Sequence, residues 1–440
     1  MRKLLSLCLL VCVPLAAQEI PRTTELSGNP FNIKKTWFIG GVGNWDYLAM
    51  DADARRLFIA HGSVVQVVDV ETGTVAGEIS GLREAHAIAL DDTGEFGYIS
   101  DGRANSVKVF DRRSLQVVAT IPTVPNPRAL VFEPQTKLLF VVCTVPPTAS
   151  PAATTDCRGP QPVLPRGSRV RANAAPVNVA SSIAVIDTGN RTALGEILLP
   201  GKLGFAQADG SGKVYVNVTD RNQVYRIDAQ AIANLLQKQL AAKTSATPAP
   251  PAPDPSTVLA ADPSVNPSAR IEVFTPAVTI DWSAIRPPEE DIVTFSLPKE
   301  CQQPTSLAID GPHTRLFAAC GNWKLTVLNA ITGEPIASMT TGPGTDAMAY
   351  DQGRGLIFVA NGGGYGSLTI VRQDATTDTY AVIQNLPTSE RARTLAVDAT
   401  TGEVYMVTDF HGVDLTHAGG IGDLKTVPVS GSFQVLVIGH

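Results

Sequence analysis

Short apolar runs alternate with turn residues along most of this 440-residue chain. Within residues 85–122 the runs AIAL, FGYIS, VKVF and VVATI are separated by DDTG, DGRAN and DRRS. Each run is too short for a typical helix and is rich in residues that favour strands. The segment therefore predicts four antiparallel strands of one sheet.

The same unit recurs seven times. Its first strands read WDYLAMD, AHAIALD, PRALVFE, LGFAQAD, PTSLAID, TDAMAYD and ARTLAVD, beginning at Trp45, Ala85, Pro127, Leu203, Pro304, Thr345 and Ala392. A period of about 40 residues with four strands per unit is typical of a β-propeller, whose blades bury their faces against each other. We therefore expect an all-β, seven-bladed β-propeller of four-stranded blades.

The two ends of the chain predict how the ring closes. The seventh copy ends at His440 after its third strand, and an unassigned strand at Lys35–Ile39 precedes the first copy. Pairing these segments completes the last blade and removes an exposed edge. Residues 18–440 are thus expected to form a single domain.

Three insertions interrupt the regular blades, at about 145–180, 229–290 and 410–431. The first and third enlarge links between second and third strands, so both should emerge on one face of the ring. The second lies between third and fourth strands and should emerge on the other face. It begins with the helix-like stretch AQAIANLLQKQLAAK and continues through a Pro/Ala-rich part, typical of an extended or flexible segment.

The first 17 residues predict a secretory signal peptide: Arg2 and Lys3 precede an apolar run that ends in small residues. A lipid anchor on Cys12 is the alternative. The run is too short for a membrane-spanning helix. We therefore expect a periplasmic or extracellular protein, with no transmembrane segment.

Charge and cysteine content add two expectations. A net charge of −6 without a basic run argues against a nucleic-acid partner. Outside the predicted signal, the cysteines are Cys143, Cys157, Cys301 and Cys320. An even number of cysteines suits disulfides in an oxidising compartment. Three pairings are open, and the nearest neighbours predict Cys143 with Cys157 and Cys301 with Cys320.

The blade pattern resembles that of the YVTN-repeat, YncE-like family of exported bacterial seven-bladed propellers. The resemblance rests on the LAxD first strand, the RLFVA-like second strand and the VxVID-TG turn after the third strand, and it covers nearly all of the predicted mature chain. It implies a fold more than a function. The family and its relatives include binding proteins, surface-layer components and, more distantly, quinoprotein and lactonase enzymes.

The second residue of each first strand should point to one mouth of the central channel. These residues are Asp46, His86, Arg128, Gly204, Thr305, Asp346 and Arg393. Acids and arginines together can orient an anionic or zwitterionic ligand. The alternative is that the charges only neutralise one another around a solvated channel. Residues that end second strands, namely His61, Asp101, Asn361 and Asp409, should lie nearby, although Asp and Asn there also serve the following turn.

Other candidate sites are weaker. His411, Asp414 and His417 are potential metal ligands, but their spacing fits no known motif and favours a chance cluster in a loop. The motif GxSxG does not occur, and no cofactor is predicted. We expect Trp45 and Trp323 to pack between blades, and Trp282 to be an exposed contact for a partner.

The sequence thus favours a monomeric binding or interaction scaffold whose ligand or partner docks at the channel mouth. One alternative is an enzyme of lactonase or quinoprotein type, with His86 as acid–base and an arginine stabilising negative charge. Another is a structural component of the cell envelope. No catalytic motif supports the enzyme.

Overall fold

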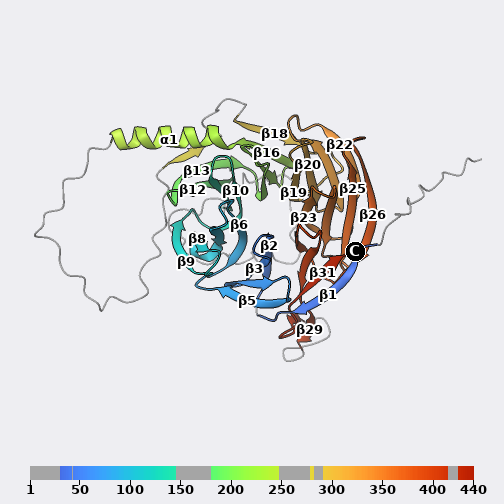
Figure 1. Cartoon of the computed structure of the whole chain (residues 1–440). Coiled ribbons are helices and arrows are strands. Elements are labelled where there is room, and N and C mark those ends of the chain that lie inside the picture. Colours follow the sequence, from blue (N-terminus) through green and yellow to red (C-terminus); the bar gives the residue numbers. More distant parts are fainter. Residues whose placement is uncertain (1–29, 42, 145–179, 247–277, 282–290, 415–424) are drawn as a thin grey trace, which may run out of the picture.

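The computed structural model describes residues 30–41, 43–144, 180–246, 278–281, 291–414 and 425–440. Seven sheets are arranged as blades around a central axis, as Figure 1 shows. Each blade is an antiparallel meander, so the predicted seven-bladed β-propeller is confirmed.

The strands of the blades have the following bounds. Blade one contains β2 (Trp45–Asp51), β3 (Arg56–His61), β4 (Val64–Asp69) and β5 (Thr74–Ile79); blade two contains β6 (Ala85–Leu90), β7 (Phe96–Asp101), β8 (Ser106–Asp111) and β9 (Val117–Pro122). Blade three contains β10 (Pro127–Glu133), β11 (Leu138–Cys143), β12 (Ala180–Asp187) and β13 (Thr192–Pro200); blade four contains β14 (Leu203–Ala208), β15 (Lys213–Val218), β16 (Gln223–Asp228) and β18 (Ile292–Ser296). Blade five contains β19 (Pro304–Asp310), β20 (Arg315–Cys320), β21 (Lys324–Asn329) and β22 (Pro335–Thr340); blade six contains β23 (Thr345–Asp351), β24 (Leu356–Asn361), β25 (Ser367–Asp374) and β26 (Thr379–Pro387). Blade seven contains β27 (Thr394–Val397), β28 (Val404–Thr408), β31 (Gln434–Gly439) and β1 (Asn32–Phe38).

The core lies between neighbouring blades. Phe58 of blade one and Phe110 of blade two have ring centroids 5.5 Å apart, and both rings are fully buried. Alternating strand residues point into these interfaces, because successive side chains of a strand face opposite sides of the sheet. Each blade is therefore stabilised by its two neighbours.

Blade seven is closed by the N-terminal strand, as predicted. β1 pairs antiparallel with β31, with Thr36 opposite Leu436. Trp37 on β1 stacks on Tyr405 of β28, with ring centroids 5.8 Å apart. The ring is therefore held shut by both ends of the described chain.

The second insertion contributes structure of its own. The predicted helix is present as α1 (Ala229–Ala246), and the backbone N–H of Ala229 donates to the carbonyl of Gly212 in the β14–β15 turn, 3.0 Å away. Ile232 and Leu236 are fully buried against blades three and four. β17 (Thr279–Asp281) pairs parallel with β13 and gives blade three a fifth strand that the sequence did not predict. In Figure 1, α1 lies at the outer edge of the ring, beside β13.

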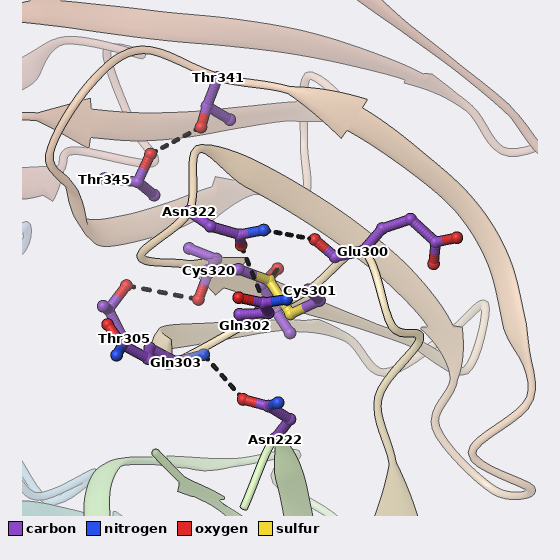
Figure 2. Close-up of a disulfide and its surroundings, with 12 residues drawn as sticks. Asn222, Glu300, Cys301, Gln302, Gln303, Thr305, Cys320, Asn322, Thr341 and Thr345 are labelled. Carbon is purple, nitrogen blue, oxygen red and sulfur yellow. Dashed lines mark hydrogen bonds between the residues drawn. A yellow bond between two sulfur atoms is a disulfide. The ribbon is translucent and has the colours of Figure 1, made fainter. Parts of the chain in front are cut away.

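One predicted disulfide is present, between Cys301 and Cys320 (Figure 2). It joins the segment before β19 to the end of β20. Cys143 is a free, fully buried thiol, whose pKa is raised by burial, and Cys157 lies outside the described residues. The predicted Cys143–Cys157 bond therefore stays a prediction.

In the described part of the chain, no helix is both long enough and apolar enough to span a membrane. The predicted signal peptide, residues 1–17, lies outside the described residues, so it too stays a prediction.

Candidate functional site

One face of the ring is defined by a hydrogen bond that recurs in blades one to six. In each of them, the residue that follows the second strand donates its backbone N–H to the segment that leads into the first strand. The donor–acceptor pairs are Gly62–Asn44, Gly102–Glu84, Thr144–Asn126, Thr219–Lys202, Gly321–Gln303 and Gly362–Gly344. We call this side the mouth face. The turns between first and second strands lie on the opposite face.

The described ends of the insertions agree with the predicted faces. Thr144, which precedes the first insertion, bonds to the segment leading into β10, on the mouth face. Thr408, which precedes the third, donates its Oγ1–H to the carbonyl of Glu390, 2.8 Å away, also on the mouth face. The third insertion includes a hairpin of β29 (His411–Asp414) and β30 (Lys425–Pro428). α1 begins beside the β14–β15 turn, on the opposite face.

In six blades, the first strand contains a bulge at the equivalent position. The register shifts just after the first residue of β2, β6, β10, β14, β19 and β23. Bulges commonly redirect side chains at the rims of closed sheets. The predicted ring residues, such as Asp46 and His86, occupy these bulges. The bulge explains how a residue of a buried strand can carry a charge at the channel mouth.

Asp46 is the centre of the charged cluster at this mouth. Its Oδ2 lies 2.8 Å from Nδ1 of His86 and 3.8 Å from Nη2 of Arg128. A second pair lies alongside, with 3.8 Å between Nε of Arg393 and Oδ2 of Asp346. The structure therefore brings five of the predicted ring residues into two neighbouring groups of charges.

His86 lies beneath the surface of the mouth rather than on it. The residue is 5% exposed, and its Nε2 is buried without a hydrogen-bond partner, 3.7 Å from Glu84. Its Nδ1 is hydrogen-bonded to Asp46, so His86 helps to hold the carboxylate of Asp46 at the mouth.

A cavity of about 690 Å³ opens at the mouth, next to this cluster. Two carboxylates, Asp46 and Glu84, line it together with His86. Five arginines also line it: Arg83, Arg103, Arg128, Arg391 and Arg393. The lining is thus strongly cationic, although the whole chain is acidic.

The guanidinium groups of these five arginines donate no hydrogen bond within the part of the chain that the structure describes. Their ion pairs are loose: Arg103 is 3.3 Å from Glu84, and Arg128 is 3.8 Å from Asp46. Arg391 lies 3.2 Å from Asp409 without hydrogen-bond geometry and 5.2 Å from the centre of the Trp45 ring. Side chains of Arg103, Arg128 and Arg393 are about half or more exposed. Their donors are therefore free to bind a ligand.

Arginines of the opposite face are bonded differently. Arg315 donates two hydrogen bonds to Asp378, at 2.9 and 2.8 Å. Arg112 donates to Asp51 at 3.0 Å, and its side chain is only 10% exposed. These arginines only neutralise carboxylates of the same chain, which is the role that the sequence analysis gave as the alternative for the mouth residues. The mouth arginines do not share it.

Burial also changes the titration of the mouth. The pKa of Asp346 is raised by burial, although Arg393 lowers it and Asp46 raises it further. The pKa of the hydroxyl of Tyr47, the residue after Asp46, is raised by burial and by the carboxylates of Asp46 and Asp346. A partly desolvated mouth strengthens the attraction between its arginines and an anion.

Three of the predicted second-strand residues are buried and bonded within the protein. His61 places Nδ1 2.7 Å from Oε1 of Gln66 and is 2% exposed. Asp101 accepts hydrogen bonds from the backbone N–H groups of Arg83 and Glu84. Asn361 is fully buried and donates to Thr369 Oγ1 at 3.0 Å. These residues shape the turns beneath the mouth and do not line the cavity.

Asp409 and the metal candidates belong to blade seven. Asp409 is 7% exposed and lies 3.1 Å from Nε2 of His411. The backbone of Asp414 pairs with Lys425 in the β29–β30 hairpin, and His417 lies outside the described residues. Among the described residues, no group of three potential ligands could hold a metal ion.

The tryptophans are only partly as predicted. Trp45 is 3% exposed and packs on Phe433, with ring centroids 5.3 Å apart. The prediction for Trp323 is wrong, because its side chain is 51% exposed. Its φ of 67° turns it outward at the β20–β21 turn. Trp282 lies outside the described residues, so its predicted role stays untested.

Sequence reasoning missed Arg83, Arg103, Arg391 and Glu84. They come from turns and from the segments that lead into first strands, whereas the prediction followed the strands alone. Arg83 and Glu84 immediately precede β6, and Arg103 lies in the short 3-10 turn η1 (Gly102–Ala104) after β7. Aligning the loops of the seven copies, as well as their strands, could have found them.

Comparisons with known proteins support the fold and no more. No family profile and no curated protein matches the sequence. The solved structure of U3-55K aligns with 91% of this chain over 97% of its own length, with a TM-score of 0.56 and 10% identity. The crystal structure of the RRP9 WD40 repeats aligns with 91% of this chain over 96% of its own length, with a TM-score of 0.56 and 10% identity. A chain of the Mitotic Checkpoint Complex aligns with 96% of this chain over 99% of its own length, with a TM-score of 0.55 and 12% identity.

These similar structures are β-propellers of the WD40 type, and at such low identity they show a shared fold only. The resemblance to the YVTN-repeat family is not confirmed by a family match.

Proposed function

We propose that this chain is an exported binding scaffold that holds a ligand or partner at the channel mouth. One observation carries the proposal: one cavity is lined by five guanidinium groups that donate no hydrogen bond to the described residues. A rigid closed ring that positions loops from different blades is well suited to binding. Membership of the YVTN-repeat family, the monomeric state and export are parts of the same proposal.

The charge balance of the cavity supports binding over an idle channel. Five arginines line the cavity with two carboxylates, and Asp409 and Asp346 lie beside Arg391 and Arg393, so the arginines still outnumber the nearby carboxylates. Like charges held together in this way repel one another. Walls of low dielectric constant focus such a field and raise the local concentration of an oppositely charged ligand. A ligand that supplies negative charge would relieve the repulsion.

The disulfide supports export. Such bonds persist in oxidising compartments and are rare in the cytosol. The bond between Cys301 and Cys320 is therefore in keeping with the predicted signal peptide.

Recovery of native complexes tests the proposal. Wild-type protein, the variant R128E/R393E and the control R113E are expressed in the source cells, reversibly crosslinked and purified. Arg113 is exposed in the β8–β9 turn on the opposite face, so R113E reverses a charge away from the mouth. We expect wild type and R113E to recover the same ligand or partner, and R128E/R393E to lose it. Equal recovery by all three proteins would contradict the proposal.

A further inference from the structure

We infer that the ligand of the mouth face is an acidic polypeptide segment, whose carboxylates meet the mouth arginines and whose apolar side chains meet an aromatic rim. The rim consists of Trp323, Tyr365 and Phe410. This inference rests on the binding role proposed above and specifies the chemistry of the partner.

The mouth arginines are spread over three blades. Arg83 and Arg103 belong to blade two, Arg128 to blade three, and Arg391 and Arg393 to blade seven. Four of them lie beside four different carboxylates, those of Glu84, Asp46, Asp409 and Asp346, so they do not converge on one point. A ligand with several anionic groups along one backbone can reach several of these arginines at once.

The neighbouring carboxylates favour a polypeptide over a nucleic acid. Oxygens of Asp46 and Asp346, which lie beside the arginines, can accept hydrogen bonds from the backbone N–H groups of a peptide. A phosphate backbone offers only acceptors, so it cannot donate hydrogen bonds to these carboxylates. In an acidic peptide, the carboxylates can bind the mouth arginines, and the backbone N–H groups can bind the carboxylates of Asp46 and Asp346.

The rim is a second, independent observation on the same face. Trp323, Tyr365 and Phe410 follow the second strands of blades five, six and seven and are 51%, 95% and 51% exposed. Tyr and Trp are enriched among the residues that dominate binding energy at protein interfaces. The rim residues do not line the cavity. A partner must therefore extend beyond the cavity to contact them, which a small polycarboxylate cannot do.

The backbone of Trp323 is anchored within its turn. The disulfide fixes Cys320, and the backbone N–H of Trp323 donates to the carbonyl of Cys320 at 3.0 Å. Asn322 accepts from the backbone N–H of Gln302 and donates to the carbonyl of Glu300, which ties the turn to the neighbouring segment (Figure 2). A positive φ is sterically unfavourable for a bulky residue. The fold thus maintains an unfavourable backbone conformation that presents an indole to solvent, which preorganises it for a partner.

Fluorescence anisotropy with defined peptides tests the inference on the full chain. The probe is a labelled peptide of Glu-Glu-Phe repeats, and its control is the Gln-Gln-Phe analogue. We expect wild type to bind the Glu peptide and not the Gln peptide. R128E/R393E should lower the affinity at least about tenfold, because it removes charge-assisted hydrogen bonds and adds repulsion, whereas R113E should leave the affinity unchanged.

The rim is tested with a second pair of probes. In W323A and Y365A, we expect the affinity for the Glu-Glu-Phe peptide to fall by about threefold or more, because aromatic contacts are lost. The affinity for plain oligoglutamate should stay the same, since it uses the arginines alone. Arg103 is 64% exposed, so R103E serves as the charge-reversal variant if the double variant does not fold.

Each opposite result overturns the inference. Tighter binding of citrate than of the peptide would show a site for a small polycarboxylate, and tighter binding of oligothymidylate would show a nucleic-acid site. Equal affinities of R113E and R128E/R393E would show that the mouth does not bind the peptide. If native complexes still depend on the mouth arginines in any of these cases, the proposed function survives and only the acidic peptide is wrong.

Discussion

The arginines at the two faces of the ring differ in their hydrogen bonds and in their exposure. On the opposite face, Arg112 and Arg315 donate hydrogen bonds to carboxylates of the same chain. At the mouth, Arg128 and Arg393 only approach carboxylates, at 3.8 Å, and remain about half exposed. Exposed ion pairs contribute little to stability, whereas buried pairs are costly to break. The two groups should therefore respond differently to mutation.

Removing an arginine from each face tests this difference. Arg112→Leu leaves the carboxylate of Asp51, whose side chain is 2% exposed, without its cation. We expect the free energy of unfolding to fall by about 3–5 kcal/mol. Arg128→Leu should change it by less than about 0.5 kcal/mol. Urea denaturation of both variants measures these values, and a similar loss in both would mean that Arg128 is structural too.

Asp346 gives the mouth a dependence on pH. Burial raises its pKa above the unfolded value of about 3.9. Folding then favours the protonated carboxyl, so this contribution to stability is present below the unfolded pKa and is lost as the pH rises through the folded pKa. The side chain is 42% exposed, so water screens the effect and we expect a small slope.

The variant D346N isolates that slope. It lacks the titrating group, so its melting temperature relative to wild type should rise as the pH increases through the folded pKa of Asp346. Thermal melts of both proteins from acid to neutral pH measure the difference. A constant difference across this range would show that Asp346 titrates alike in the folded and unfolded chains.

Asn361 separates a structural role from a binding role. Its amide donates to Thr369, and its carbonyl accepts from Thr345 Oγ1 at 2.9 Å, in a fully buried position. Asn361→Ala removes both of these buried hydrogen bonds, so we expect a loss of about 1–3 kcal/mol in urea denaturation. Affinity for the Glu-Glu-Phe peptide should not change. Lost affinity with unchanged stability would instead place Asn361 in the binding site.

At the scale of elements, the bulges and turns carry the residues that differ between blades and that form the mouth face. The first-strand bulge carries the ring residues to the mouth, and the turns after second strands carry the rim. In blade five, the disulfide anchors the turn that holds Trp323. Strands supply the shared scaffold, and the irregular positions supply what differs between blades.

The disulfide should stabilise both the protein and this turn. Its cysteines are 19 residues apart, and closing a loop of that size is worth about 3 kcal/mol. We expect the double variant C301A/C320A to lose about that much in urea denaturation. Amide hydrogen exchange at Trp323 should accelerate more than in the equivalent turn of blade one. An unchanged exchange rate at Trp323 would show that the hydrogen bonds hold the turn without the disulfide.

The regular elements could be predicted from the sequence because a blade is a local pattern. The seven copies share the acidic end of the first strand, and the strand missing at His440 predicted the closure by β1. β17 could not be predicted, because three residues inside a Pro/Ala-rich insertion carry no period and its pairing with β13 is a tertiary contact. Propensity does not fix such pairings.

The site could be predicted only where it follows the repeat. Asp46 and Arg128 occupy an equivalent position of two blades, which an alignment of strands reveals. Arg103 and Arg391 reach the same cavity from turns, whose direction depends on the whole ring. Trp323 was assigned to packing because its positive φ cannot be read from residue type.

On the scale of the whole molecule, the closed ring separates two faces with different chemistry. The mouth face gathers exposed aromatic residues and arginines that donate no hydrogen bond to the described residues. On the opposite face, Arg112 and Arg315 are held in internal hydrogen bonds. The helix α1 begins on the opposite face and lies at the outer edge of the ring (Figure 1). The central claim is that partners contact the mouth face.

Site-specific photo-crosslinking in the source cells tests this claim most directly. Ser63 lines the cavity, and Asp53 lies on the opposite face of the same blade; both are exposed. A photoreactive residue at position 63 should crosslink to a discrete partner, and R128E/R393E should abolish that product. The same residue at position 53 should give no such product. Equal crosslinking at both positions, or a partner found only at position 53, would contradict a binding surface at the channel mouth.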